Sequence, residues 1–203
     1  MGFFDRQSGE LQKRGLDPSR LPPGQYFTDR FPVLHAGVVP DVDTSDWDFD
    51  VDGLVGNSER WTLDEFKALP SAELTADIHC VTKWSKFDTQ WRGVPTTEVA
   101  KIVEPSPSAT HVLVRAEHGF TANLPLEDFL REDNLFAYEF GGEDLELDHG
   151  WPLRLVVPHL YFWKSVKWTR GFTVLDHDEP GFWERNGYHM YGDPFQEQRY
   201  WGD

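Results

Sequence analysis

The 203-residue sequence has a single cysteine, few basic residues and no long apolar run. One cysteine cannot form a disulfide within the chain, which agrees with a reducing compartment. No run of about eighteen apolar residues occurs, so we expect no membrane-spanning helix and no membrane insertion. The N-terminal stretch MGFFDRQSGELQKRG lacks the apolar core of a signal peptide and a twin-arginine pair, and the sequence therefore predicts a cytoplasmic protein.

The shortage of basic residues gives the chain a formal net charge of −16, with 19 Lys and Arg against 35 Asp and Glu. Binding to nucleic acid is not expected, because it needs clustered cations that face phosphates. An acidic surface keeps a protein soluble, and it also suits a salt-rich cytoplasm. Loss of the folded state in low salt would support the second explanation.

Residues 1–30 are expected to form an irregular arm, because LDPSRLPPGQYF contains three prolines and a glycine. From residue 31 to 203 the pattern is that of one domain with many short strands and brief helices between them. Thr62 and Glu65 form a capping box at the start of one helix, and Thr96 and Thr97 are candidate caps for another, at 98–103. We expect strands at 43–55, 73–81, 111–116, 120–124, 135–140, 153–157 and 166–175. This arrangement predicts an α+β fold with mixed β-sheets and short helices.

The most informative stretch is Ala76–Pro95, which reads ADIHCVTKWSKFDTQWRGVP and contains the only cysteine, Cys80. A free cysteine most often acts as a small buried hydrophobe. Here the cations Lys83, Lys86 and Arg92 follow it, and positive neighbours favour the thiolate, which attacks electrophiles or binds metals. The pattern therefore favours a functional thiol.

This stretch resembles the cysteine segment of the molybdopterin-dependent sulfite oxidase family, in which a Cys-Val-x-x-Trp-Ser run precedes Trp-x-Gly-Val-Pro. A second block, Tyr138–Trp168, reads YEFGGEDLELDHGWPLRLVVPHLYFWKSVKW and is similar to the pterin-binding segment of that family. The resemblance covers roughly Asp29–Leu175. It implies a sulfite-oxidase-type molybdopterin-binding fold, a Mo-molybdopterin cofactor and a two-electron oxidoreductase, most simply one that transfers an oxygen atom to or from a small-molecule substrate.

The resemblance also implies roles for individual residues. Cys80 matches the molybdenum ligand, a role that suits a soft thiolate. Tyr138 matches a tyrosine that helps to position the substrate, with Lys83 or Arg92 as contacts for a substrate anion. The implied cofactor contacts are His35, His118, His149, Arg154, Ser165, Val166 and Lys167.

Residue type alone leaves simpler explanations open for several of these positions. His35 is more readily explained as a buried, hydrogen-bonded histidine. Tyr138 could equally be a core strand residue, and His118 could be a turn residue. These explanations stay open at the level of sequence.

Departures from the family pattern bear on the substrate. Leu34 and His35 stand where the family usually has an arginine and an asparagine, and no arginine immediately follows Cys80. Sulfite oxidation is therefore not the expected activity. No Cys-x-x-Cys-His motif for haem is present, so the resemblance implies an external electron-transfer partner.

Two other classes of protein remain possible from the sequence. Cys80 could be the nucleophile of a hydrolase or thiol peroxidase, with His79 or His149 as its base. The chain could instead be an acidic binding module without a cofactor. A zinc enzyme is less favoured, because the eight histidines show neither His-x-x-x-His spacing nor paired cysteines.

Overall fold

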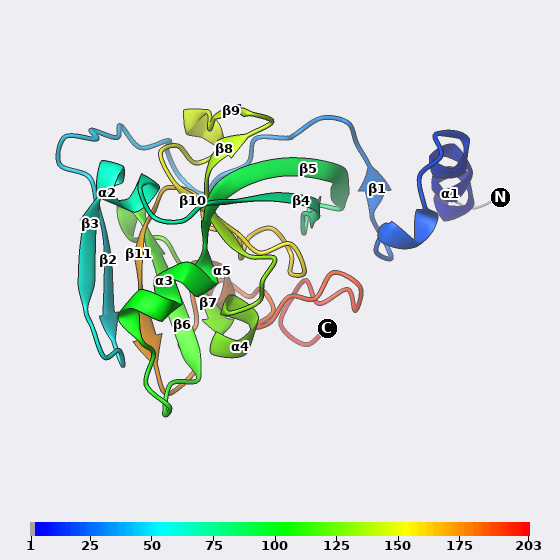
Figure 1. The fold of residues 1–203 in the computed structure, drawn as a ribbon. Coiled ribbons are helices and arrows are strands. Elements are labelled where there is room, and N and C mark those ends of the chain that lie inside the picture. The colour runs from blue at the N-terminus through cyan, green and yellow to red at the C-terminus, as the bar shows by residue number, and fades with distance from the viewer. Residues whose placement is uncertain (1–2) are drawn as a thin grey trace.

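Two β-sheets form the framework of the structure, a computed structural model that describes residues 3–203 (Figure 1). The six-stranded sheet contains β1 (Tyr26–Phe27), β4 (Ala72–His79), β5 (Trp84–Pro95), β8 (Leu135–Phe140), β9 (Glu143–Asp144) and β10 (Arg154–Val156). The five-stranded sheet contains β2 (Asp48–Gly53), β3 (Glu59–Thr62), β6 (His111–Ala116), β7 (Thr121–Pro125) and β11 (Thr169–Leu175). The α-helices are short: α1 (Phe3–Lys13), α2 (Leu63–Lys67), α3 (Thr96–Val103), α4 (Leu126–Phe129) and α5 (Phe182–Arg185). Each sheet combines parallel and antiparallel pairs, so the predicted α+β fold is confirmed.

The main core lies between the five-stranded sheet and β8 of the other sheet. Strand β6 alternates buried and half-buried residues, which places its apolar side chains on one face. Phe49 of β2 packs against Phe136 of β8 with ring centroids 4.9 Å apart, and Phe136 stacks on Phe172 of β11 at 6.1 Å. These contacts fix the two sheets against each other.

The helix caps agree with the sequence in one case and differ in the other. At α2 the Thr62 side chain accepts from the Glu65 amide and the Glu65 carboxylate accepts from the Thr62 amide, so the predicted capping box is confirmed. The prediction that Thr96 or Thr97 caps α3 is wrong, because β5 continues to Pro95 and both threonines lie within the helix. The Thr96 hydroxyl instead donates to the Phe129 carbonyl in the core at 2.5 Å.

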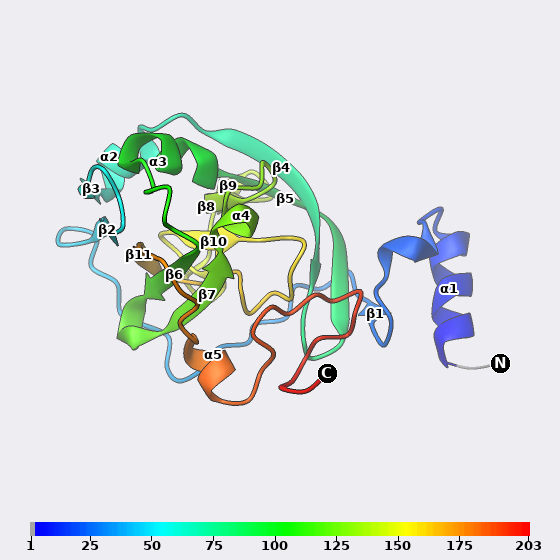
Figure 2. The same cartoon turned by 90° about the horizontal axis from the view of Figure 1, so that it is seen from below.

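The N-terminal arm is more regular than its proline content indicated. Residues Phe3–Lys13 form α1, and Leu11 is fully buried, so the expectation of an irregular arm over residues 1–30 is wrong for this part. The prolines begin only at Pro18 and leave the preceding residues free to form a helix. Both views show α1 at the outer end of the arm, beyond β1 (Figures 1 and 2).

The strand β5 is the element that brings the two informative blocks of sequence together. It pairs with β4 on one side and with β8 on the other, and Cys80 lies in the turn between β4 and β5. The loop between β10 and β11 packs against that turn, where the Phe162 amide donates to the His79 carbonyl at 2.8 Å. No helix within residues 3–203 has the length and apolar character needed to cross a membrane.

Candidate functional site

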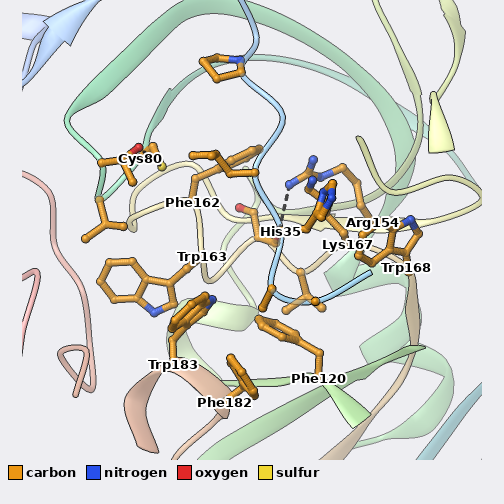
Figure 3. Close-up of a pocket in the computed structure, with 18 of the residues that line it drawn as sticks. His35, Cys80, Phe120, Arg154, Phe162, Trp163, Lys167, Trp168, Phe182 and Trp183 are labelled. Carbon is orange, nitrogen blue, oxygen red and sulfur yellow. Dashed lines mark hydrogen bonds between the residues drawn. The ribbon is translucent and has the colours of Figure 1, made fainter. Parts of the chain in front are cut away.

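A cavity of about 580 Å³ opens beside the β4–β5 turn (Figure 3). Its walls come from segments that are far apart in the sequence: residues 31–38, the turn at Cys80, the β6–β7 turn, the loop between β10 and β11, and α5. Figure 3 shows Cys80 on one side of the cavity and Arg154 and Lys167 on the other. The cavity thus places a thiol and two cations around one space.

Cys80 is held by the backbone of its turn. Its amide donates to the Trp84 carbonyl at 2.9 Å, and its carbonyl accepts from the Lys83 amide at 2.9 Å. The thiol is buried and lies 3.2 Å from the Thr82 hydroxyl. Burial raises the pKa of the Cys80 thiol, while the hydrogen bond with Thr82 and the charge of Lys167 act in the opposite direction.

The cations that follow Cys80 in the sequence do not surround it in the structure. Lys83 is exposed, Lys86 donates to the Asp29 carbonyl, and Arg92 is exposed and lies 3.7 Å from a carboxylate of Glu139. None of the three lines the cavity, so the structure gives no support to the roles predicted for them beside the thiol and a substrate anion. Closeness in sequence is a poor guide to closeness in space for these cations, because successive side chains of a strand point to opposite faces.

Arg154 provides the deepest positive charge at the cavity. It is fully buried, and its guanidinium donates to the carbonyls of His149 at 2.7 Å and Ser165 at 2.9 Å. Burial lowers the pKa of Arg154 to about 9. Among the described residues no carboxylate lies within salt-bridge distance of this guanidinium. A buried charge without a counter-ion is unfavourable, and the site therefore favours an anionic ligand.

Lys167 lies on the same side of the cavity as Arg154. Burial and the neighbouring Arg154 charge lower the pKa of Lys167 to about 7. Its ammonium donates to the Asp148 carbonyl at 2.6 Å, and no described carboxylate forms a salt bridge with it. An anion next to Lys167 would favour the protonated form, so this residue can respond to ligand charge.

Most of the residues predicted to contact a cofactor do line the cavity, namely His35, His118, Arg154, Ser165, Val166 and Lys167. His35 and His118 are exposed at its edge, and the His35 ring lies 5.8 Å from that of Trp168. The buried-histidine explanation for His35 is therefore wrong. The Ser165 hydroxyl accepts from the Val157 amide at 2.9 Å and thereby shapes the loop.

His149 and Tyr138 lie elsewhere. The His149 ring stacks on Phe31 at 4.0 Å and contacts its carbonyl at 3.3 Å, and burial lowers the pKa of His149. It supports the segment that covers the cavity without lining the cavity itself. Tyr138 is buried in the main core with the Lys67 ammonium 5.1 Å from its ring centroid, because the strand alternation of β8 directs it there. Its predicted catalytic role is not supported.

An aromatic wall was missed by reasoning from the sequence. Phe120, Phe162, Trp163, Phe182, Trp183 and Tyr188 line the cavity, and several come from the tail that follows β11. The Trp163 indole donates to the buried Glu184 carboxylate at 2.8 Å, which fixes α5 behind this wall. The aromatic content of the tail was visible in the sequence, but its lack of a regular period concealed where it packs.

The structure gives little support to a cysteine nucleophile with a histidine base. The His79 ring pairs with the Ser85 hydroxyl at 2.9 Å, and burial lowers the pKa of His79 to about 4. Neither His79 nor His149 lines the cavity. No cluster of three or more His, Cys, Asp and Glu side chains suited to a metal ion occurs in the described part of the chain.

Comparison with protein families gives a match over residues 35–183 to the oxidoreductase molybdopterin binding domain. The uncharacterized oxidoreductase YuiH of Bacillus subtilis is 50% identical over 185 residues, which cover 91% of this chain and 93% of that protein. The putative protein-methionine-sulfoxide reductase subunit YedZ1 of Azospira oryzae is 28% identical, over 87% of this chain and 70% of its own length.

More distant similarities extend to larger proteins. The mitochondrial sulfite oxidase of Drosophila melanogaster is 28% identical over 81% of this chain, which corresponds to 34% of that protein. Among solved structures, the sulfane dehydrogenase SoxCD of Paracoccus pantotrophus superposes with a TM-score of 0.64 at 20% identity, over 73% of this chain and 42% of that one. This likeness confirms the sulfite-oxidase-type molybdopterin-binding fold.

Proposed function

The chain belongs to the oxidoreductase molybdopterin binding domain family, and on that premise we propose that Cys80 is the protein ligand of its molybdenum. The protein is a molybdopterin-binding oxidoreductase of the sulfite oxidase type. The observation that carries the proposal is the buried thiol in the same cavity as two cations without carboxylate partners.

The residues of the cavity fit the chemistry of this cofactor. A thiolate is a soft donor of the kind that binds soft metal centres. Arg154 and Lys167 offer positive charge to an anionic phosphate, and the nearby loop adds backbone groups. When bound, a molybdopterin centre supplies two-electron redox chemistry with oxygen-atom transfer.

Some residues of the cavity would bind the cofactor, and others would shield it from water. Cys80 would hold the metal side of the cofactor, and Arg154 and Lys167 the phosphate side, with His35 and His118 at the edge. The segment from Phe31 to Val38 and the aromatic wall line the cavity, and they would limit the access of water to a bound cofactor. A dry site strengthens every charge interaction within it.

The proposed substrate is a small molecule that gives or accepts an oxygen atom. Of the arginines in the described residues, only Arg154 lines the cavity, and the proposal already assigns its charge to the cofactor phosphate. Sulfite, a compact dianion, is therefore not the substrate that we propose. An external partner would supply or remove electrons.

Replacing Lys167 by glutamine is expected to lower molybdopterin retention at least about tenfold, because a charge-assisted hydrogen bond to an anion is lost. The measurement is pterin content per chain after purification from a molybdopterin-competent host. Lys83→Gln is the matched control, since it removes one ammonium close to Cys80 in sequence but outside the cavity. Equal retention in the two variants would contradict the assignment of Lys167.

The proposal itself is tested by elemental analysis of the unmodified protein from the same host. We expect molybdenum in stoichiometric amount together with a pterin, and a screen of small sulfoxides and N-oxides, run in both directions, should then find the substrate. Protein that folds in this host yet carries no molybdenum would contradict the proposal.

A further inference from the structure

The arm before residue 31 and the tail after residue 183 lie outside the family match. The arm contacts the Cys80 turn, and the tail contacts the arm at Pro23. Gln25 is fully buried, and its side-chain amide donates to the Cys80 carbonyl at 3.1 Å. The same carbonyl accepts from the Lys83 amide within the turn. The arm thus contacts the backbone of the very residue that carries the thiol.

The backbone of the arm holds Gln25 in register with the turn. Strand β1 pairs in parallel with the start of β5, so that the Tyr26 amide donates to the Lys83 carbonyl at 2.8 Å and the Thr28 amide to the Ser85 carbonyl at 2.9 Å. Gln25 therefore occupies a defined position relative to Cys80.

Tyr161 lies close to the Gln25 side chain. Burial raises the pKa of Tyr161 to about 12, against smaller opposing effects of Arg199 and Gln25. The Gln25 carbonyl oxygen and the Tyr161 hydroxyl are both buried and have no hydrogen-bond partner among the described residues. The Gln25 amide is thus held through its nitrogen, by the bond to the Cys80 carbonyl.

The C-terminal tail contacts the arm at Pro23. The Arg199 guanidinium is largely buried, donates to the Pro23 carbonyl at 3.2 Å, and lies 5.3 Å from the Tyr161 ring centroid. Figure 2 shows part of the C-terminal tail next to β1. We call residues 23–25 of the arm and 197–199 of the tail the clasp.

The Cys80 turn has reason to need such support. Lys83 adopts a φ of 75°, a left-handed conformation that is unfavourable for a lysine. The turn has two backbone hydrogen bonds of its own, and the Gln25 amide adds one from outside that helps to hold the strained conformation.

We propose that Gln25 is a positioning residue for Cys80 and that the clasp fixes the cysteine turn. The inference goes beyond the proposed function, and it rests on that function only where it concerns the bound metal. In the free protein, the clasp limits local opening of the turn. In the loaded enzyme, it sets the direction from which the sulfur approaches.

The first test is the rate at which iodoacetamide alkylates Cys80, the only cysteine, in full-length cofactor-free protein. In Gln25→Met, which keeps the size of the side chain, we expect alkylation about tenfold faster, because a buried hydrogen bond that limits local opening is lost. Gln12→Met is the control, since Gln12 is exposed on the same arm, and its rate should equal that of the unmodified protein.

A second variant keeps the test decisive should Gln25→Met fail to fold. Arg199→Met removes the contacts of the tail with Pro23 and Tyr161, and it should accelerate alkylation in the same direction by a smaller factor. Rates within about twofold of the unmodified protein in the folded variants would overturn the proposal. A lower melting temperature without faster alkylation would do the same.

The loaded enzyme supplies an independent readout. The Mo(V) electron paramagnetic resonance spectrum should change in Gln25→Met and stay unchanged in Gln12→Met. Faster alkylation in a protein that never carries molybdenum would contradict the proposed function while leaving the clasp intact. Unchanged alkylation and an unchanged spectrum in a molybdenum-loaded protein would contradict the clasp alone.

Discussion

Replacing Cys80 by serine is expected to lower turnover of the loaded enzyme by more than about a hundredfold, the upper range found when a partner of a metal ligand is lost. Serine offers a hard, protonated oxygen where the metal is expected to need a soft thiolate. The fold should survive, because the change is nearly isosteric and the Cys80 side chain forms one hydrogen bond, with Thr82. Steady-state kinetics with the substrate found by the screen measure the effect.

The control for this variant is Ser58→Ala, a change of similar size at an exposed position outside the cavity. Its turnover should equal that of the unmodified enzyme, and both variants should melt at similar temperatures. Turnover in Cys80→Ser within about tenfold of that of the unmodified enzyme would contradict the proposal that the thiol is a metal ligand.

Replacing Lys164 by methionine is expected to lower the free energy of unfolding by about 3–5 kcal/mol, because it leaves a buried carboxylate without its cation. The Lys164 ammonium lies 2.6 Å from the Glu184 carboxylate, with the two side chains 1% and 0% exposed. It also donates to the carbonyls of Asn123 and Met190. Urea unfolding of the cofactor-free protein measures the loss.

A second substitution separates the buried charge from simple packing. Lys164→Met combined with Glu184→Gln should recover most of the lost stability, because the amide oxygen can still accept from the Trp163 indole. The matched control is Lys101→Met, which breaks an exposed pair with Glu98 and should change stability by less than about 1 kcal/mol. Equal stability of the single and double variants would contradict this explanation.

The local features of the fold were predictable because their signals are local. Alternating apolar residues predicted β6 and β8, and the Thr62–Glu65 capping box predicted α2. The helix α1 was missed because the nearby prolines were given too much weight, although they follow it. Strand β5 was not predicted, because the cations and tryptophans of Trp84–Pro95 were interpreted as parts of a site.

The residues of the site were also predictable only in part. Resemblance to a family placed Cys80 and Lys167 in one site, which no local pattern could do, because they lie in separate blocks of sequence. In the structure, the cation whose charge lowers the pKa of the Cys80 thiol is Lys167, and not one of the cations next to Cys80 in the sequence. Gln25 could not have been found, since a glutamine in a proline-rich arm carries no signal until the chain folds.

Molybdenum X-ray absorption tests the assignment of Cys80 most directly. Comparison of the unmodified enzyme with Cys80→Ser should show one sulfur fewer per molybdenum in the variant, at the short distance of a directly bound thiolate. The same sulfur count in both proteins would mean that Cys80 does not bind the metal.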